Sequence, residues 1–469
     1  MMQQGQMVRA LVTAALVVGL GCSTALGADE RVLTAAEVLE SVEANGDYAV
    51  TIAAADIDIA HARLQEAGAG LMPKLTLSAS SQFYRPSAHK QYSNDNADAY
   101  GKLEVVQPLY DFGQSASVRD AAGKDAEAAE QILTSARNTV LLEGLALYFD
   151  LHASELEVRA LNEAHTSAYL RWDRAKENFA LGRASPVEVA EALKFAEKSR
   201  LIYFSERSQN AVYRLRLEEL MGSALPEELI VPPKPPKAKH SAIDRKKFVA
   251  AVWGTNPELA ALAKQGEATG LRREGVAQLP SLEAYANTGY TTRDLRGRDD
   301  YAVGARLSWP IFDGGLTAAK KTRLAAEQSR VNARFEAKKS DLRRRALTLL
   351  MSLDDTYQRV IAARAQHDYT SKFLVQRQQL YAQERVADLG TAMVEHTSSE
   401  AELVRATGAY LLVQAQLAVL LGEQPGRSLE PDFFAAQNLL DTDSGDFVPK
   451  AGTGFGQEDE NSFKRQEQK

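Results

Sequence analysis

The segment from Gln114 to Leu181 constrains the fold more than any other part of the sequence, because it contains no proline and shows helical periodicity throughout. Small or apolar side chains recur every three or four residues from Leu142 to Phe179, as in closely packed coiled coils. At about 1.5 Å per residue, this segment forms a rod of roughly 100 Å, which is longer than one compact domain can bury. Residues 316 to 388 repeat the pattern. The sequence therefore predicts a mainly helical protein with unusually long helices.

The sequence contains one unit of about 200 residues twice. The heptapeptide QPLYDFG at residues 107–113 returns as WPIFDGG at residues 309–315, and a Leu-Gly pair at 181–182 returns at 389–390. These matches divide the chain into a first repeat, residues 29–230, and a second repeat, residues 241–430, joined by a proline-rich linker at residues 231–240. The tail at residues 438–469 is polar, charged and rich in glycine, and its composition predicts disorder.

Residues 1–28 have the pattern of a secretory signal peptide, with Arg9 ahead of an apolar run that ends at Gly21 and small residues after it. Cleavage after Gly27 removes the single cysteine of the chain, whereas cleavage before Cys22 leaves a thiol available for lipid attachment. One cysteine excludes a disulfide framework. Beyond residue 28 no run of 18 apolar residues occurs, so no helix is expected to span a bilayer.

Four segments alternate between apolar and polar side chains, at residues of about 74–84, 99–109, 281–291 and 300–311, and this period of two predicts strands. A strand of this length, tilted by about 45°, spans roughly 25 Å, the height of the apolar band on an outer-membrane barrel. A soluble sheet with one wet face is the alternative. If the strands lie in lipid, four cannot close a barrel, and lipid tolerates no open sheet edge. The barrel hypothesis therefore requires an oligomer.

Each long helix is expected to end at a glycine and turn back into a second helix. Leu181 and Gly182 supply the stop, and Ser185 and Glu188 have the spacing of a capping box with a proline between them. In the second repeat Gly390 is the matching stop, and Thr391 is a potential cap without an acid three residues later. We expect a left-handed backbone at both glycines.

The two-fold repeat, the strand-ending heptapeptides and the Leu-Gly hairpins together resemble the TolC family of outer-membrane efflux and secretion channels, over nearly all of residues 32–430. The resemblance implies an α+β, mainly α fold, in which two structural repeats form a periplasmic tunnel of long antiparallel coiled-coil helices. It also implies a homotrimer whose four strands per chain share one 12-stranded transmembrane β-barrel in the outer membrane of a Gram-negative bacterium, in contact with its lipid. The implied function is the passive exit duct of a tripartite efflux pump or type I secretion system, joined to an inner-membrane transporter by a periplasmic adaptor protein.

The resemblance also implies site residues near the periplasmic aperture. Family members have an acidic residue after each hairpin, which makes Glu188 and Glu395 the aperture candidates here, with Glu191 and Asp388 as further candidates. The resemblance also implies that the adaptor docks on the hairpin tips, which contain Gly182, Ser185, Gly390 and Thr391. A role in capping the helix explains an acidic residue at position 188 equally well. A place on a solvated helix face is the alternative explanation for Glu395. Some members lock the aperture with a tyrosine and an arginine, but Ala387 and Ala392 occupy those places here.

Other function classes are disfavoured. The formal net charge of −7 gives the chain no large positive electrostatic field to attract nucleic acid, so we expect no nucleic-acid partner. The seven histidines lack the spacing of metal ligands, and we expect no enzyme and no cofactor. A trimeric coiled-coil surface adhesin and a periplasmic scaffold remain as alternatives. An adhesin places its strands together at the C-terminus, however, and a scaffold has no membrane strands.

Overall fold

The computed structural model describes residues 33–83, 97–225, 236, 243–291, 301–383 and 388–429, together with positions 433, 437 and 439. The expected signal peptide with Cys22 lies outside the described residues, as do nearly all of the linker and of the tail. Leu439 is an exception within the expected tail, because it is buried and its carbonyl oxygen accepts a hydrogen bond of 2.9 Å from the backbone of Asp244.

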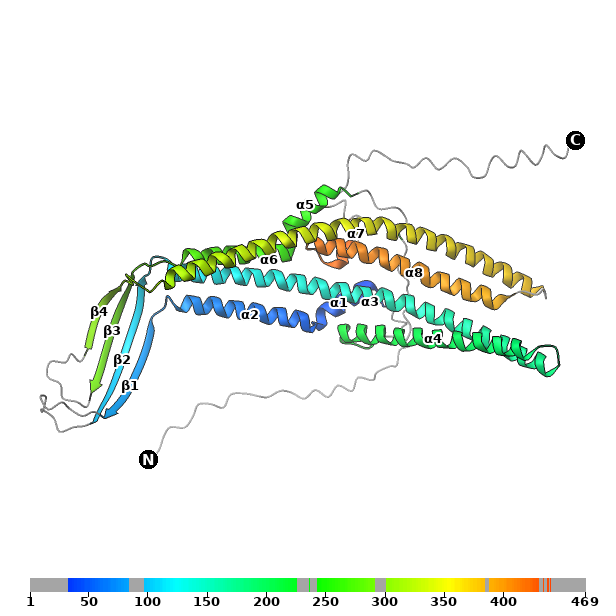
Figure 1. Ribbon diagram of the computed structural model, residues 1–469, viewed down its shortest axis with the longest axis horizontal. Coiled ribbons are helices and arrows are strands. Elements are labelled where there is room, and N and C mark those ends of the chain that lie inside the picture. The colour runs from blue at the N-terminus through cyan, green and yellow to red at the C-terminus, as the bar shows by residue number, and fades with distance from the viewer. Residues whose placement is uncertain are drawn as a thin grey trace, which may run out of the picture.

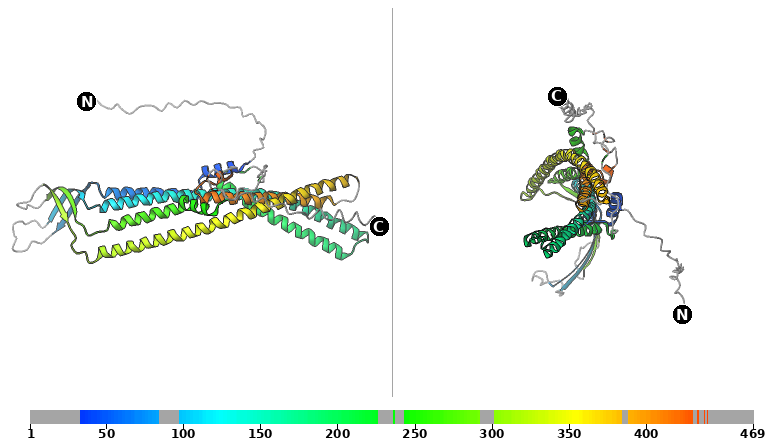
Figure 2. Two further views of the ribbon diagram at one scale, coloured as in Figure 1. Left: turned by 90° about the horizontal axis from the view of Figure 1, so that it is seen from above. Right: turned by 90° about the vertical axis from the view of Figure 1, so that its right-hand side faces the viewer.

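The two repeats have the same order of elements, two helices, two strands and two helices (Figure 1). The first repeat comprises α1 (Ala35–Asn45), α2 (Tyr48–Ala69), β1 (Lys74–Phe83), β2 (Ala97–Tyr110), α3 (Gln114–Ala180) and α4 (Pro186–Met221). The second comprises α5 (Arg245–Thr255), α6 (Pro257–Glu274), β3 (Ser281–Thr291), β4 (Tyr301–Ser308), α7 (Leu316–Ala382) and α8 (Leu389–Leu420), followed by the short η1 (Pro425–Leu429). The strands lie at one end of an elongated molecule and the helical hairpins α3/α4 and α7/α8 at the other. Viewed from the hairpin end, the helices form a curved layer with α1 and α5 outside the curve (Figure 2).

The four strands form one antiparallel sheet in the order β1-β2-β3-β4, so the central β2–β3 pair joins the two repeats. Leu77 faces Leu103 across the first pair, and Ala286 faces Val303 across the last. Leu77 and Val303 are 76% and 80% exposed, which argues against a soluble sheet with one buried apolar face. β4 ends at Ser308, earlier than expected, because Pro310 has no N–H to continue the ladder.

The repeated heptapeptide forms the same turn in both repeats. The Asp111 carboxylate accepts backbone hydrogen bonds from Gly113 and Ser115, at 3.1 and 2.7 Å, and the Asp313 carboxylate accepts the equivalent bonds from Gly315 and Thr317, at 3.0 and 2.8 Å. Both glycines cap a helix with a left-handed backbone, at φ 84° and 88°. This turn starts α3 and α7, each of which has 67 residues.

A second pair of equivalent junctions stacks shorter helices end to end. The Asn256 side chain donates to the carbonyl oxygen of Leu420 at 3.1 Å, where α8 meets α6, and Asn45 donates to Leu220 at 3.1 Å, where α4 meets α2. Gly222 and Gly422 end the incoming helices with left-handed backbones, at φ 66° and 80°. The stacked pairs line the two long helices along most of their length.

The hydrophobic core is concentrated at these junctions. One buried cluster joins α5, α7 and α8, and a second joins α1, α3 and α4; their fully buried members include Phe248, Leu353 and Leu417 in the first and Leu145 and Leu217 in the second. α8 is long and apolar enough to cross a membrane by composition alone, but 56% of its apolar window is buried inside the molecule, as in a core helix.

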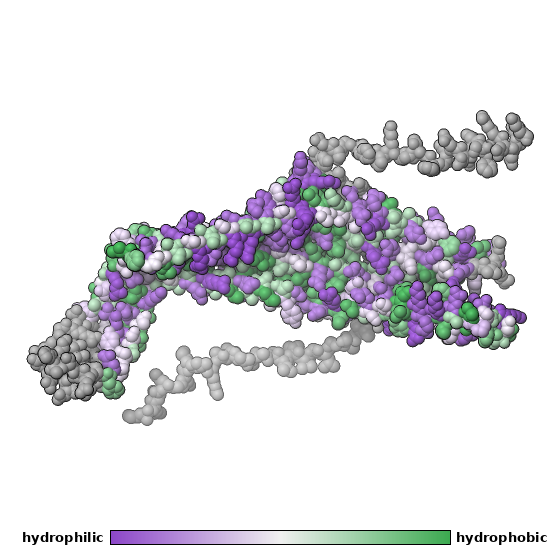
Figure 3. Space-filling model, in the orientation of Figure 1, coloured by the Kyte–Doolittle hydropathy of each residue, from purple (hydrophilic) through white to green (hydrophobic). Residues whose placement is uncertain are grey.

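The expected coiled-coil stripe is only partly buried. Phe149 and Leu156 are buried on α3, whereas Phe179 nearer the tip is 48% exposed and Tyr369 on α7 is 57% exposed. On α4, Val187 and Leu201 are largely exposed. Hydrophobic and hydrophilic residues are mixed over the hairpin end of the molecule (Figure 3). One chain therefore leaves much of its hairpin surface uncovered.

Candidate functional site

The tip of the α3/α4 hairpin has the local structure that its sequence predicts. Gly182 is left-handed, at φ 69°, and the next residue, Arg183, donates a backbone hydrogen bond of 2.7 Å to Asn178. The Ser185 hydroxyl accepts from the backbone of Glu188 at 3.2 Å, and the Glu188 carboxylate accepts from the backbone of Ser185 at 2.8 Å. The Glu188 carboxylate therefore serves the helix start as a capping group.

The α7/α8 tip differs from the expectation. Asp388, not Thr391, is the N-cap of α8, so Gly390 lies within the first helical turn and lacks the left-handed backbone that we expected. A Cβ atom on Gly390 would lie 2.8 Å from the hydroxyl oxygen of Ser167 on α3. The glycine therefore allows α8 to lie against α3 without moving the Ser167 hydroxyl, a contact that its neighbours in sequence do not reveal.

Arg171 on α3 bridges the two hairpins. Its guanidinium donates to the carboxylate of Asp388 and to the hydroxyl of Thr391, both at 3.1 Å. Thr391 in turn donates to the Asp388 carboxylate, with its hydroxyl at 2.7 Å and its backbone N–H at 3.2 Å. Asp388 and Thr391 were candidates from the sequence, but Arg171 was not, because a contact across 217 positions leaves no local pattern.

These bonds favour the charged form of Asp388. Hydrogen bonds from the side chain and backbone of Thr391, together with the nearby guanidinium groups of Arg171 and Arg377, hold the pKa of the Asp388 carboxyl below its ordinary value. The Arg171 and Asp388 side chains are 61% and 60% exposed, so solvent screens the pair and limits its contribution to about 1 kcal/mol or less.

Arg171 also lies beside the acidic candidates of the first hairpin. With Glu188, Glu191, Phe195 and Lys198 it lines a groove of about 480 Å³ between α3 and α4. Glu395 is exposed on α8 and does not line this groove. Within one chain, the candidates thus separate into Glu188 and Glu191 on one hairpin and Glu395 on the other, with Arg171 in contact with both hairpins.

The described part of the chain contains no group of three or more His, Cys, Asp or Glu residues placed to hold a metal ion. His367 and His396 stack with ring centroids 5.1 Å apart, which is contact between ring faces rather than convergence of ring nitrogens on one point.

The comparisons with known proteins agree with this architecture. Residues 44–223 match the sequence profile of the outer membrane efflux protein family, and no curated protein sequence matched the chain. The CmeC outer membrane channel of Campylobacter jejuni has 16% identity and a TM-score of 0.67, over 87% of this chain and 90% of that chain. The outer membrane protein VceC of Vibrio cholerae has 17% identity and a TM-score of 0.63, over 83% of this chain and 96% of that chain. The MtrE outer membrane channel of Neisseria gonorrhoeae has 17% identity and a TM-score of 0.57, over 83% of this chain and 89% of that chain.

Proposed function

We propose that this chain, a member of the outer membrane efflux protein family with the TolC-type channel fold, is the passive exit duct of a tripartite efflux pump or a type I secretion system. The family match over residues 44–223 supports an outer-membrane efflux channel, and no enzymatic step is assigned to it. The finer proposal concerns its assembly, its gate and its partners.

The main support for the proposal is that the four-stranded sheet has two unpaired edges. β1 and β4 are the two edges of the four-stranded sheet, and their apolar side chains are exposed. Lipid does not tolerate unpaired strand edges, so β4 of one copy must pair with β1 of the next until the barrel closes. Three copies give 12 strands, and the exposed apolar side chains of α4 then face neighbouring copies.

Cysteine cross-linking tests this assembly. Ser78 on β1 and Ala305 on β4 lie on opposite edges of one sheet, with β2 and β3 between them, so cysteines at both positions cannot join within a chain. We expect oxidation of Ser78→Cys/Ala305→Cys in membranes to give dimer and trimer bands and no larger species, with neighbouring register positions tested in parallel. Each single-cysteine variant is the control. A ladder beyond three copies, or only monomers at every register, would contradict the closed trimer.

We place the gate and the adaptor-docking surface at the hairpin end. The Arg171–Asp388–Thr391 contacts support this proposal, because they tie the two hairpins together at positions near the tips, in place of the tyrosine and arginine lock of some family members. Gly182, Ser185, Gly390 and Thr391 lie in the two turns that an adaptor on the periplasmic side meets first. An inner-membrane transporter is then joined through that adaptor.

A further inference from the structure

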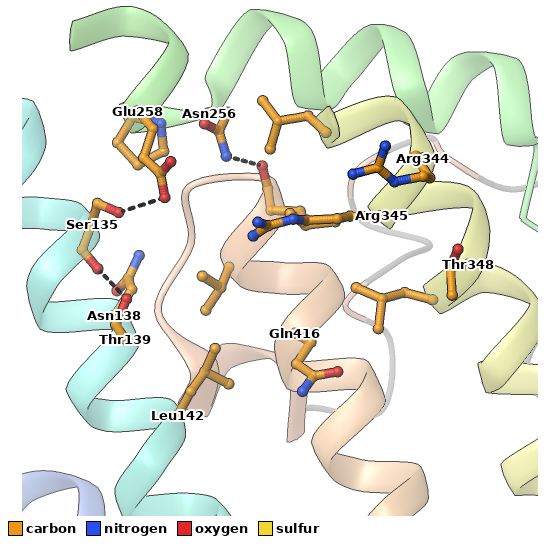
Figure 4. Close-up of a pocket in the computed structure, with 15 residues that line it drawn as sticks. Ser135, Asn138, Thr139, Leu142, Asn256, Glu258, Arg344, Arg345, Thr348 and Gln416 are labelled. Carbon is orange, nitrogen blue, oxygen red and sulfur yellow. Dashed lines mark hydrogen bonds between the residues drawn. The ribbon is translucent and has the colours of Figure 1, made fainter. Parts of the chain in front are cut away.

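A cavity of about 460 Å³ lies where α3, α6, α7 and α8 meet (Figure 4). Leu142 of α3, Leu342 and Leu349 of α7 and Val419 of α8 give it apolar walls. Polar side chains converge on it from all four helices. Apolar walls with polar groups that converge from different elements are typical of a small-molecule site.

Asn138 is the first indication of a ligand. Its side chain lines the cavity and has a relative exposure of 2%, yet its amide nitrogen has no hydrogen-bond partner among the residues that the structure describes. A buried donor without an acceptor destabilises a protein, and such groups are rare in folded chains. A molecule in the cavity that carries an acceptor would satisfy this donor.

The charges around the cavity give the sign of that molecule. Arg344 and Arg345 share one carboxylate, Asp341, and Glu258 is paired with Lys338. Three cations against two carboxylates leave one positive charge. The contact of Arg345 with Asp341 uses its Nε atom, at 2.8 Å, and a guanidinium has five N–H donors in all. Figure 4 shows the Arg345 side chain reaching into the cavity from α7, while Asn138 lines the opposite wall on α3.

The only carboxylate lining the cavity is already engaged. Glu258 accepts a hydrogen bond of 3.2 Å from the hydroxyl of Ser135 in addition to its ion pair with Lys338. A cationic ligand would have to displace these partners, whereas an anion meets a donor on each side. The cavity therefore favours an acceptor with negative charge over a cation.

We propose that this cavity binds a singly charged anionic amphiphile, such as a medium-chain carboxylate. Its head group pairs with the Arg345 guanidinium and accepts a hydrogen bond from the Asn138 amide, and its chain lies against Leu142, Leu342 and Leu349. All of the residues that line the site come from one copy of the chain, so the proposal does not rest on the proposed pump partners.

Binding of decanoate to the full-length protein in amphipol, measured by isothermal titration, tests the proposal, with decan-1-ol as the neutral probe of the same chain length. We expect decan-1-ol to bind at least about tenfold more weakly than decanoate. Arg345→Gln should weaken decanoate about tenfold, as expected for one charge-assisted hydrogen bond. Arg330→Gln, which removes an exposed α7 arginine outside the cavity, is the matched control and should leave binding unchanged.

Asn138→Leu supplies a second, independent readout. Leucine removes the unsatisfied donor and occupies similar volume, so the empty protein should melt at the same or a higher temperature while decanoate binding is lost. A lower melting temperature would show that the amide has a partner in the protein. That result would overturn the proposal, as would undetectable decanoate binding to the wild type, equal binding of the alcohol, or binding that Arg345→Gln leaves unchanged.

Discussion

At the scale of single residues, Gly422 illustrates how two requirements can meet at one position. Its backbone is left-handed, at φ 80°, and an added Cβ would lie 2.7 Å from the carbonyl oxygen of Thr255 in the stacked helix junction. The second requirement depends on Thr255, a residue far away in the chain. Local motifs predict backbone conformation, and the partner of a close approach has to be seen in the fold.

Gly422→Ala should therefore destabilise the protein by about 2 kcal/mol or more, because left-handed strain adds to overlap with a backbone atom. Gly315→Ala is the matched control: φ is 88° there, but nothing lies within 4 Å of the added Cβ, so strain alone should cost about 1 to 2 kcal/mol. Thermal unfolding in detergent compares the two variants. Equal losses of stability would mean that the junction relaxes around the new methyl group.

Arg171 is the residue whose loss should open the proposed gate. Arg171→Gln removes the ion pair with Asp388 and weakens the bridge between α3 and α8, at a cost of about 1 kcal/mol or less in each copy. We expect higher single-channel conductance in planar bilayers. Arg171→Lys keeps the charge but loses the paired donors. The conductance of this variant should therefore lie between those of the wild type and of Arg171→Gln. If Arg171→Gln conducts like the wild type, the bridge does not hold the gate.

The lowered pKa of Asp388 predicts how this gate responds to pH. A carboxyl whose folded pKa lies below its ordinary value of 3.8 gives its full stabilisation above that value and loses it as pH falls through the lower, folded pKa. Conductance should therefore stay constant from pH 8 to 5 and rise only below about pH 4. Asp388→Asn should conduct more at neutral pH and lack the acid-induced rise. A wild-type transition near pH 6 would assign gating to another group.

At the scale of elements, the repeated heptapeptide marked the starts of the two long helices. Asp111 and Asp313 make the same bonds to the first turn of α3 and α7, so a local motif was sufficient to predict where both long helices begin. The hairpin turns were less predictable. The Gly182 turn follows from residues near it in sequence. The left-handed backbone expected at Gly390 was wrong because Asp388 caps α8 and places the glycine in the first helical turn, where Ser167 of another helix lies close.

The two hairpin glycines should consequently respond differently to a compensating change. Gly182→Ala introduces left-handed strain, and Gly390→Ala introduces a clash with Ser167; we expect both to reduce export of a reporter substrate while the trimer persists. Adding Ser167→Gly should restore export to Gly390→Ala but not to Gly182→Ala. Rescue of both variants, or of neither, would contradict the separate roles assigned to the two glycines.

At the scale of the whole molecule, one chain supplies an incomplete structure. The number and length of the strands indicated that several copies must share a barrel, and the open sheet edges and exposed apolar side chains agree with that inference. The cavity around Asn138 could not be predicted, because its lining comes from four helices that are distant in sequence. Periodicity predicts each helix separately, but it does not specify which side chains of different helices converge.

The proposed acidic aperture belongs to this largest scale, because it would form only where three copies meet around one axis. Three Glu395 side chains would concentrate negative potential at a narrow opening and hold divalent cations that obstruct it. Glu395→Gln should raise single-channel conductance or relieve block by divalent cations. Glu188→Gln should have a smaller effect on both, because the Glu188 carboxylate is bonded to the backbone of Ser185. Planar-bilayer recordings at fixed salt, with and without magnesium, separate the two variants. Unchanged conductance and unchanged magnesium block in Glu395→Gln would move the constriction to other residues, and Asp388, which already contacts both hairpins through Arg171, is the next to test.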